Sequence, residues 1–224
     1  MDITFLGHAT FTLSDGSTTL LVDPFLEGNP SATIGPDDVE ATTILLTHGH
    51  FDHHADTIKI AKRTGANVIA IKELADEVAE DDIEVADPNF GGKVDQPWGS
   101  VRLLPAWHSG VTPKGTVHPP AGLLIEFAGK RVYFTGDTSL FTDLQLAKRY
   151  GRIDLCVLPI GGHYTMDQYD AVTAAEWIGA DAYVPCHYDT FPPIAADAQQ
   201  FKADVQGGGF GEVHVLAPGE STSL

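Results

Sequence analysis

Cysteine is scarce in this chain, with only Cys156 and Cys186 among 224 residues, and both lie in apolar, strand-like segments. This pattern favours free thiols in a reducing compartment over a disulfide framework. No apolar run approaches the roughly 20 residues that a transmembrane helix requires. The N-terminal run of residues 1–6 lacks the basic and apolar regions of a signal peptide. We therefore expect a cytoplasmic protein without a membrane partner.

Positive charge is also in short supply. The chain has 13 Lys and Arg against 31 Asp and Glu, which gives a net charge of −18. Such a surface repels polyanions, because nucleic-acid binding depends on many cationic contacts. We expect a small-molecule substrate and no nucleic-acid partner. The sequence leaves open whether the chain forms a homo-oligomer.

Two catalytic motifs are missing. The chain contains no Gly-x-Ser-x-Gly and no Gly-x-x-x-x-Gly-Lys, so neither a serine nucleophile of the hydrolase-elbow type nor a phosphate-cradling loop is predicted. The Gly207-Gly208-Gly209 run is predicted to be a turn. Any catalysis has to come from other residue types.

The hydrophobic pattern predicts strands in meanders with interspersed helices, in two similar halves. This arrangement favours an α/β fold in which two mixed β-sheets pack face to face with helices outside. No linker or low-complexity tract interrupts the chain, so residues 1–224 are expected to form one domain. The expected strands are 2–6, 9–13, 19–23, 42–47, 67–70, several within 83–107, 123–127, 131–135, 153–158, 181–185 and 212–216, and the expected helices are 54–64, 72–80, 139–150, 169–178 and 195–204.

Four of the ten histidines fall within residues 47–54, Thr-His-Gly-His-Phe-Asp-His-His, between an expected strand and an expected helix. Imidazole and carboxylate groups are suitable ligands for zinc, manganese or iron. His48 and His50 can project to one side of the strand end, and Asp52 and His53 can approach after the chain turns. Gly49 keeps the loop compact where the backbone passes close by. This geometry suits two metal ions a few ångströms apart.

Further ligand-type residues follow three other expected strands. His108 comes after the strand that ends at residue 107, Asp137 follows the strand 131–135, and His187 follows the strand 181–185. Sites in mixed α/β folds form at the carboxyl edges of strands. The three side chains are therefore expected to meet the 48–53 loop.

These ordered motifs resemble those of the metallo-β-lactamase fold superfamily, and the likeness covers nearly the whole chain. More narrowly, Gly7-His8-Ala9-Thr10, Asp23-Pro24-Phe25 and the segment 187–192 look like a group of small metal-dependent hydrolases near the ascorbate-phosphate lactonases. The resemblance implies an αββα sandwich with a dinuclear site between the sheets. It also implies a ligand set in which His48, His50 and His108 hold one metal, Asp52, His53 and His187 hold the other, and Asp137 bridges them.

The chemistry expected from two divalent ions is hydrolysis by a metal-bridged hydroxide acting on a small ester, lactone or phosphoester. The cofactors would be zinc or manganese, with iron as a further choice. Asp52 is expected to combine ligation with orienting the hydroxide or taking its proton. The alternatives are a nuclease and a non-hydrolytic diiron or metal-binding protein of the same fold. The net charge argues against the nuclease.

Other polar residues receive weaker assignments. His8 is predicted to contact the substrate or to support a ligand from outside. His163 is a candidate leaving-group acid and Tyr164 a candidate substrate anchor. The group that the chain resembles often has Asp-Asn-Phe-Thr-Met where this chain has Gly-His-Tyr-Thr-Met at 162–166. His54, His118 and His214 are expected to be structural or surface residues, and Lys114 a solvated loop residue.

Overall fold

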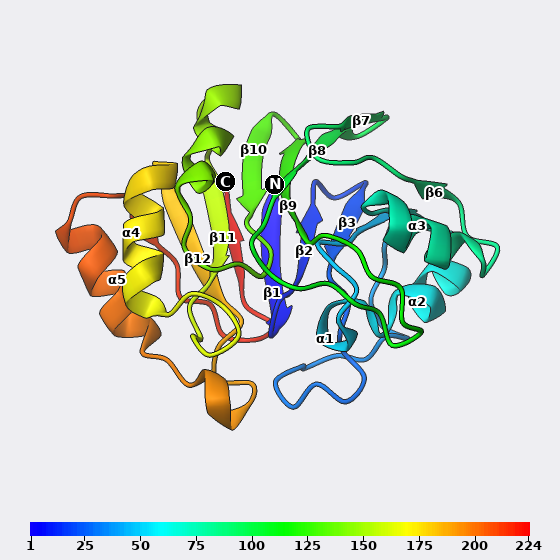
Figure 1. Ribbon diagram of the computed structural model, residues 1–224, viewed down its shortest axis with the longest axis horizontal. Helices are drawn as coiled ribbons and strands as arrows, with labels where there is room; N and C mark the ends of the chain where they lie inside the picture. The colour runs from blue at the N-terminus through cyan, green and yellow to red at the C-terminus, as the bar shows by residue number, and fades with distance from the viewer.

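Two β-sheets of seven strands each pack face to face in the computed structural model, which describes residues 1–224. Helices α4 (Gln168–Ile178) and α5 (Ala198–Gly207) cover the outer side of one sheet. Helices α2 (Thr57–Thr64) and α3 (Lys72–Ala79) cover the outer side of the other (Figure 1). The αββα sandwich of two mixed sheets is therefore confirmed.

The first sheet has the strand order β14-β1-β2-β3-β4-β5-β6. Its pairs are antiparallel from β14 to β3 and parallel from β3 to β6. The strands are β1 (Asp2–Gly7), β2 (Thr10–Ser14), β3 (Thr19–Val22), β4 (Thr43–Leu45), β5 (Asn67–Ile69), β6 (Val85–Ala86) and β14 (Ser221–Ser223).

The second sheet has the order β13-β12-β11-β10-β9-β8-β7. It is parallel from β13 to β10 and antiparallel from β10 to β7, so it repeats the arrangement of the first sheet. The strands are β7 (Lys93–Gln96), β8 (Gly99–Pro105), β9 (Ala121–Phe127), β10 (Lys130–Phe134), β11 (Leu155–Pro159), β12 (Ala182–Cys186) and β13 (Glu212–Val213).

One large apolar core joins the two sheets. Its buried side chains come from both sheets, and Phe11 of β2 packs against Phe134 of β10 with ring centroids 5.5 Å apart. A second core lies between the second sheet and helices α4 and α5, and includes Tyr133 and Phe201. Both cysteines are buried and free, as expected. None of the helices is long and apolar enough to cross a membrane.

The structure differs from the sequence prediction in four helical or strand segments. The expected helix 54–64 is interrupted, giving α1 (Phe51–His54) and α2. The interruption falls at Asp56, whose Oδ2 accepts hydrogen bonds from the N–H groups of Leu26 and Glu27. The expected helix 139–150 is a 3₁₀ helix, η1 (Thr142–Tyr150), and a second short one, η2 (Pro192–Ile194), precedes α5. Strand β14 was not predicted, because its polar sequence carries no hydrophobic alternation.

Candidate metal centre

The predicted ligands leave the ends of strands in both sheets. Residues 48–53 follow β4 of the first sheet, whereas His108, Asp137 and His187 follow β8, β10 and β12 of the second. At two of these points the backbone turns sharply out of the strand. Gly136, just before Asp137, has φ +65°, and His187 has φ +54°. Non-glycine residues with positive φ are uncommon and concentrate at functional sites. The turn at His187 therefore indicates a functional site at this edge of the sheet.

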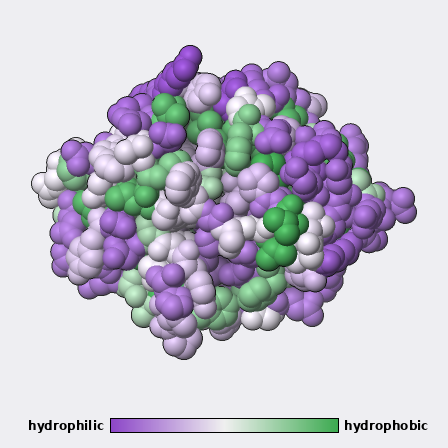
Figure 2. Space-filling view, in the orientation of Figure 1, coloured by the Kyte–Doolittle hydropathy of each residue, from purple (hydrophilic) through white to green (hydrophobic).

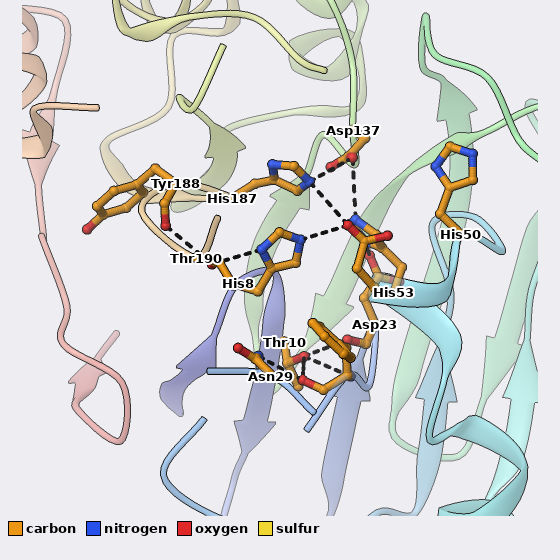
Figure 3. Close-up of polar contacts among 12 residues, drawn as sticks. His8, Thr10, Asp23, Asn29, His50, His53, Asp137, His187, Tyr188 and Thr190 are labelled. Carbon is orange, nitrogen blue, oxygen red and sulfur yellow. Dashed lines mark hydrogen bonds and ion pairs between the residues drawn. The ribbon is translucent and has the colours of Figure 1, made fainter. Parts of the chain in front are cut away.

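Asp137 lies at the centre of the cluster. Its Oδ2 atom is 3.1 Å from Nε2 of His187 and 3.3 Å from Nε2 of His53 (Figure 3). The Nε2 atoms of His108 and His48 lie 3.7 and 3.9 Å from the same oxygen. Residues that are up to about 140 positions apart in the sequence therefore converge, with one carboxylate oxygen between them.

Two of the groups of donor atoms that could hold a metal ion correspond to the predicted ligand sets. The nitrogens of His48, His50 and His108 lie within 4.8 Å of one another, and so do donor atoms of His8, Asp52, His53 and His187. The first group is one predicted ligand set, and the second is the other with His8 added. A third group, Asp23, His48 and His53, links the two. The Nε2 atom of His53 is buried and makes no hydrogen bond, although Oδ2 of Asp137 lies 3.3 Å away. An unpartnered buried nitrogen is costly in a protein interior, and a divalent cation would satisfy it. The donor set therefore fits metal ions.

Asp23 fixes the orientation of His53, and sequence reasoning did not assign it a role. Its Oδ2 atom lies 2.8 Å from Nδ1 of His53, and its Oδ1 accepts the N–H of Thr47 at 2.8 Å. Outer partners of this kind hold a ligating imidazole in one tautomer and one direction. Asp23 follows β3, and the strand-end rule that identified Asp137 could have found it. Thr47 plays a similar part for His48, with Oγ1 3.0 Å from Nδ1.

His8 lies behind Asp52 and is 1% exposed. Its Nε2 atom is 3.1 Å from Oδ2 of Asp52, and its Nδ1 atom is 2.9 Å from Oγ1 of Thr190 (Figure 3). Burial is the largest influence on His8 and lowers its pKa to about 4. A neutral His8 beside an ionised carboxylate donates from Nε2 and accepts the Thr190 hydroxyl at Nδ1. Of its two predicted roles, the geometry favours support of a ligand over contact with the substrate.

The charges within the cluster are coupled. Burial raises the pKa of Asp137, but His187 and His53 outweigh burial and bring that pKa well below its ordinary value. Burial lowers the pKa of His53, but the carboxylates of Asp137 and Asp23 outweigh it and raise that pKa. Burial is the main cause that lowers the pKa of His48. Asp137 is therefore ionised and His48 neutral near pH 7, which are the forms that ligate metals.

A cavity of about 660 Å³ opens beside the cluster. Five of the predicted ligands border it, and its other lining residues are mostly apolar. The lining consists of His50, Phe51, Asp52, His108, Ser109, Val111, Thr112, Pro113, Asp137, Tyr164, His187, Phe191 and Pro193. Tyr164, the predicted substrate anchor, is one of the lining residues.

His163 lies outside the lining. It is exposed on the loop after β11, has φ +55°, and packs its ring against Tyr164 with centroids 4.5 Å apart. The structure does not bring it to the cavity, so its assignment as a leaving-group acid gains no support from the geometry. Lys114 pairs with Asp81 at 3.4 Å and with Glu80 at 3.9 Å, in keeping with its predicted place on a solvated loop.

Comparison with known proteins gives a consistent result. Residues 2–187 match the family described as the beta-lactamase superfamily domain. The chain is 41% identical to a UPF0173 metal-dependent hydrolase of Carboxydothermus hydrogenoformans over the full length of both proteins. It is 43% identical to another from Thermococcus onnurineus, with 99% of each chain covered.

A solved structure is also similar. Igni18, described as a novel metallo hydrolase from Ignicoccus hospitalis, superposes with a TM-score of 0.90 at 33% identity, and the match covers 99% of this chain and 97% of that one. The clustered histidines and carboxylates at the strand ends thus occur in a chain that matches metal-dependent hydrolases from end to end. The chain belongs to the metallo-β-lactamase superfamily and, within it, to the UPF0173 metal-dependent hydrolases.

Proposed function

We propose that the chain is a dinuclear hydrolase of small molecules, acting on an ester, lactone or phosphoester bond. The observation that carries the proposal is that both groups of donor atoms include imidazole nitrogens close to Oδ2 of Asp137, at 3.7 and 3.9 Å in one group and 3.1 and 3.3 Å in the other. His48, His50 and His108 would hold one divalent cation. Asp52, His53 and His187 would hold the second, and Asp137 would serve both. Nitrogen and oxygen donors suit zinc, manganese or iron.

Bound divalent cations would polarise the substrate oxygen and lower the pKa of water from about 15.7 to about 7, which makes hydroxide available near neutral pH. The protein supplies the geometry. Asp23 and Thr47 hold His53 and His48 with their Nε2 atoms toward Asp137. His8 donates to Oδ2 of Asp52 and so holds this carboxylate at the cavity wall. From there Asp52 would orient a water molecule or take its proton.

Element analysis tests the dinuclear proposal. We expect about two ions per chain after loading with zinc, manganese or iron, and saturation at one ion per chain would reject a dinuclear centre. Asp137→Ala should lower both metal content and hydrolysis by more than about 100-fold, since loss of an outer partner alone costs about 10–100-fold. Asp143→Ala, an exposed carboxylate on η1, is the matched control. Retained turnover by a metal-free preparation would rule out the proposed mechanism.

The proposal includes a small-molecule substrate and no nucleic acid. The net charge of −18 is unfavourable for a polyanion, and no Lys or Arg borders the cavity. A fluorescence titration with RNA at low salt should therefore detect no binding. Tight, salt-sensitive binding would favour a nuclease instead.

A further inference from the structure

Part of the cavity lining is an apolar wall. Its carbon-rich residues come from α1, from the loop after β8, from the loop after β11, and from η2 and the residue before it. They are Phe51, Val111, Pro113, Tyr164, Phe191 and Pro193. We refer to these six residues as the apolar wall. A cavity of about 660 Å³ is in the range that encloses a small organic molecule. The wall would therefore contact the part of the substrate that does not react.

The apolar wall carries no positive charge. None of the residues that line the cavity is Lys or Arg. Lys114 follows Pro113 of the wall, but its ammonium group pairs with the carboxylates of Asp81 and Glu80. Protein sites that recognise phosphate usually supply such cations or a cluster of N–H donors. Apart from bound metal, the cavity offers a phosphoester no compensating charge.

The uncharged polar groups in the lining are few. The hydroxyl of Thr112 donates to Oε2 of Glu77 at 2.6 Å and accepts the N–H of Thr116 at 3.0 Å, so both of its hydrogen-bonding functions are used within the protein. Ser109 and Tyr164 remain, and neither hydroxyl is hydrogen-bonded to another protein group. Two hydroxyl groups suit a neutral oxygen function and cannot balance a phosphate charge.

The wall also exposes aromatic surface to water. Phe51 and Tyr164 are each 55% exposed. Apolar surface also appears in separate patches on the face shown in Figure 2, one of them over the loop that follows β8. Exposed apolar groups that border a cavity mark a binding surface, because a ligand that covers them removes their area from water. The geometry thus favours a substrate with an apolar ring or branched chain.

We propose that this site selects an uncharged carbonyl compound, a carboxylic ester or lactone with an aromatic or branched apolar group beside the scissile bond, over a phosphoester. The inference rests on the proposed hydrolytic function. In the reaction the oxygen of water forms a bond to the carbonyl carbon, and the bond from that carbon to the leaving oxygen breaks. The leaving oxygen takes a proton from the water. No oxidant or reductant is needed.

Substrates that share one leaving group test the selection on the metal-loaded enzyme. They are the 4-nitrophenyl esters of acetate and phenylacetate, 4-nitrophenyl phosphate and bis(4-nitrophenyl) phosphate, each compared with its rate without enzyme. We expect kcat/KM for the phenylacetate ester to exceed that for acetate by about 10–100-fold, from burial of the ring. The acceleration of both phosphoesters should be smaller. Greater acceleration of a phosphoester would overturn the inference and leave hydrolase function intact, whereas no turnover of any compound would overturn the function proposed above.

A binding measurement tests the wall independently of turnover. Calorimetry on metal-free protein should detect phenylacetamide, which is neutral and carries the same ring, and should detect no binding of phenyl phosphate. The reverse order would overturn the inference even if no ester is hydrolysed.

Variants of the wall test which residues select the ring. Tyr164→Ala should raise KM for the phenylacetate ester by about 10-fold and raise KM for the acetate ester by clearly less, because acetate has no ring to contact the wall. Tyr169→Ala removes a tyrosine that is 67% exposed and lies outside the cavity, and it should change neither value. Val111→Lys adds a cation to the wall and should lower KM for bis(4-nitrophenyl) phosphate. Equal effects of Tyr164→Ala on both esters would show that the wall does not select the ring.

Discussion

The Nε2 atom of His118 accepts a hydrogen bond of 2.9 Å from the backbone N–H of Gly49. This contact joins the loop between β8 and β9, which lines one side of the cavity, to the residue between the predicted ligands His48 and His50. The Nδ1 atom of His118 lies 3.3 Å from the carbonyl oxygen of Thr116, so the proton resides on Nδ1 and Nε2 is free to accept. His118 is 3% exposed and is structural, as expected, with a position that bears directly on the site.

Replacing His118 should weaken both the fold and metal binding. His118→Ala leaves the buried N–H of Gly49 without an acceptor, which costs about 1–3 kcal/mol of the free energy of unfolding. Loss of this outer support should lower metal affinity by about 10–100-fold. Urea unfolding and metal titration measure the two effects. His118→Gln, whose amide oxygen can accept, should lose less, and His214→Ala, which removes a half-buried histidine without side-chain hydrogen bonds, should lose neither.

The same contact predicts a pH dependence. Burial lowers the pKa of His118 below its ordinary value of 6.5, so near that pH the unfolded chain binds a proton that the folded protein does not. The contribution of neutral His118 to stability is therefore complete above about pH 7 and decreases as the pH falls through 6.5. Metal-free wild type should lose more of its free energy of unfolding than His118→Gln between about pH 7.5 and 5.5. Parallel curves for the two proteins would contradict this account.

Asp23 is predicted to matter for metal affinity more than for folding. Asp23→Asn keeps a residue type that tolerates the observed φ of +46°, but it replaces an acceptor for Nδ1 of His53 with an amide. We expect metal affinity to fall by about 10–100-fold in an equilibrium titration. Asp56→Asn is the matched control, because Asp56 is equally buried and bonds only to backbone N–H groups away from the cluster. Equal losses of affinity in the two variants would argue against an orienting role for Asp23.

Gly49 is predicted to tolerate no side chain. A Cβ atom there would lie 2.7 Å from Cγ2 of Thr112 and 2.9 Å from Cε1 of His118, which confirms the close approach inferred from the sequence. Gly49→Ala should destabilise the metal-free protein by about 1–3 kcal/mol through overpacking, as measured by urea unfolding. Gly207→Ala, at the end of α5 with no atom within 4 Å of the added carbon, should leave stability unchanged or raise it by up to about 1 kcal/mol. A smaller loss at Gly49 than at Gly207 would refute the packing argument.

The sequence by itself predicted the two-sheet sandwich and the convergence of seven side chains. Hydrophobic alternation located most of the strands, and strand ends in this class of fold meet at one edge. This is why His108, Asp137 and His187 could be assigned to the same site as the 48–53 loop. The break between α1 and α2 could not be predicted, because it depends on hydrogen bonds from Asp56 to a segment that lies 29 to 30 residues earlier in the chain.

Only the tertiary structure decided which residues support the predicted ligands and which residues line the cavity beside them. The pairs Asp23 with His53 and His118 with Gly49 join positions 30 and 69 residues apart, and no local pattern encodes such pairings. Nor did the sequence indicate that His8 would contact Asp52, or that His163 would lie outside the cavity. Local sequence sets backbone periodicity and the residue types available at strand ends. The partner of a buried polar group is set by the packing of the two sheets and their loops, which brings distant segments within hydrogen-bonding distance.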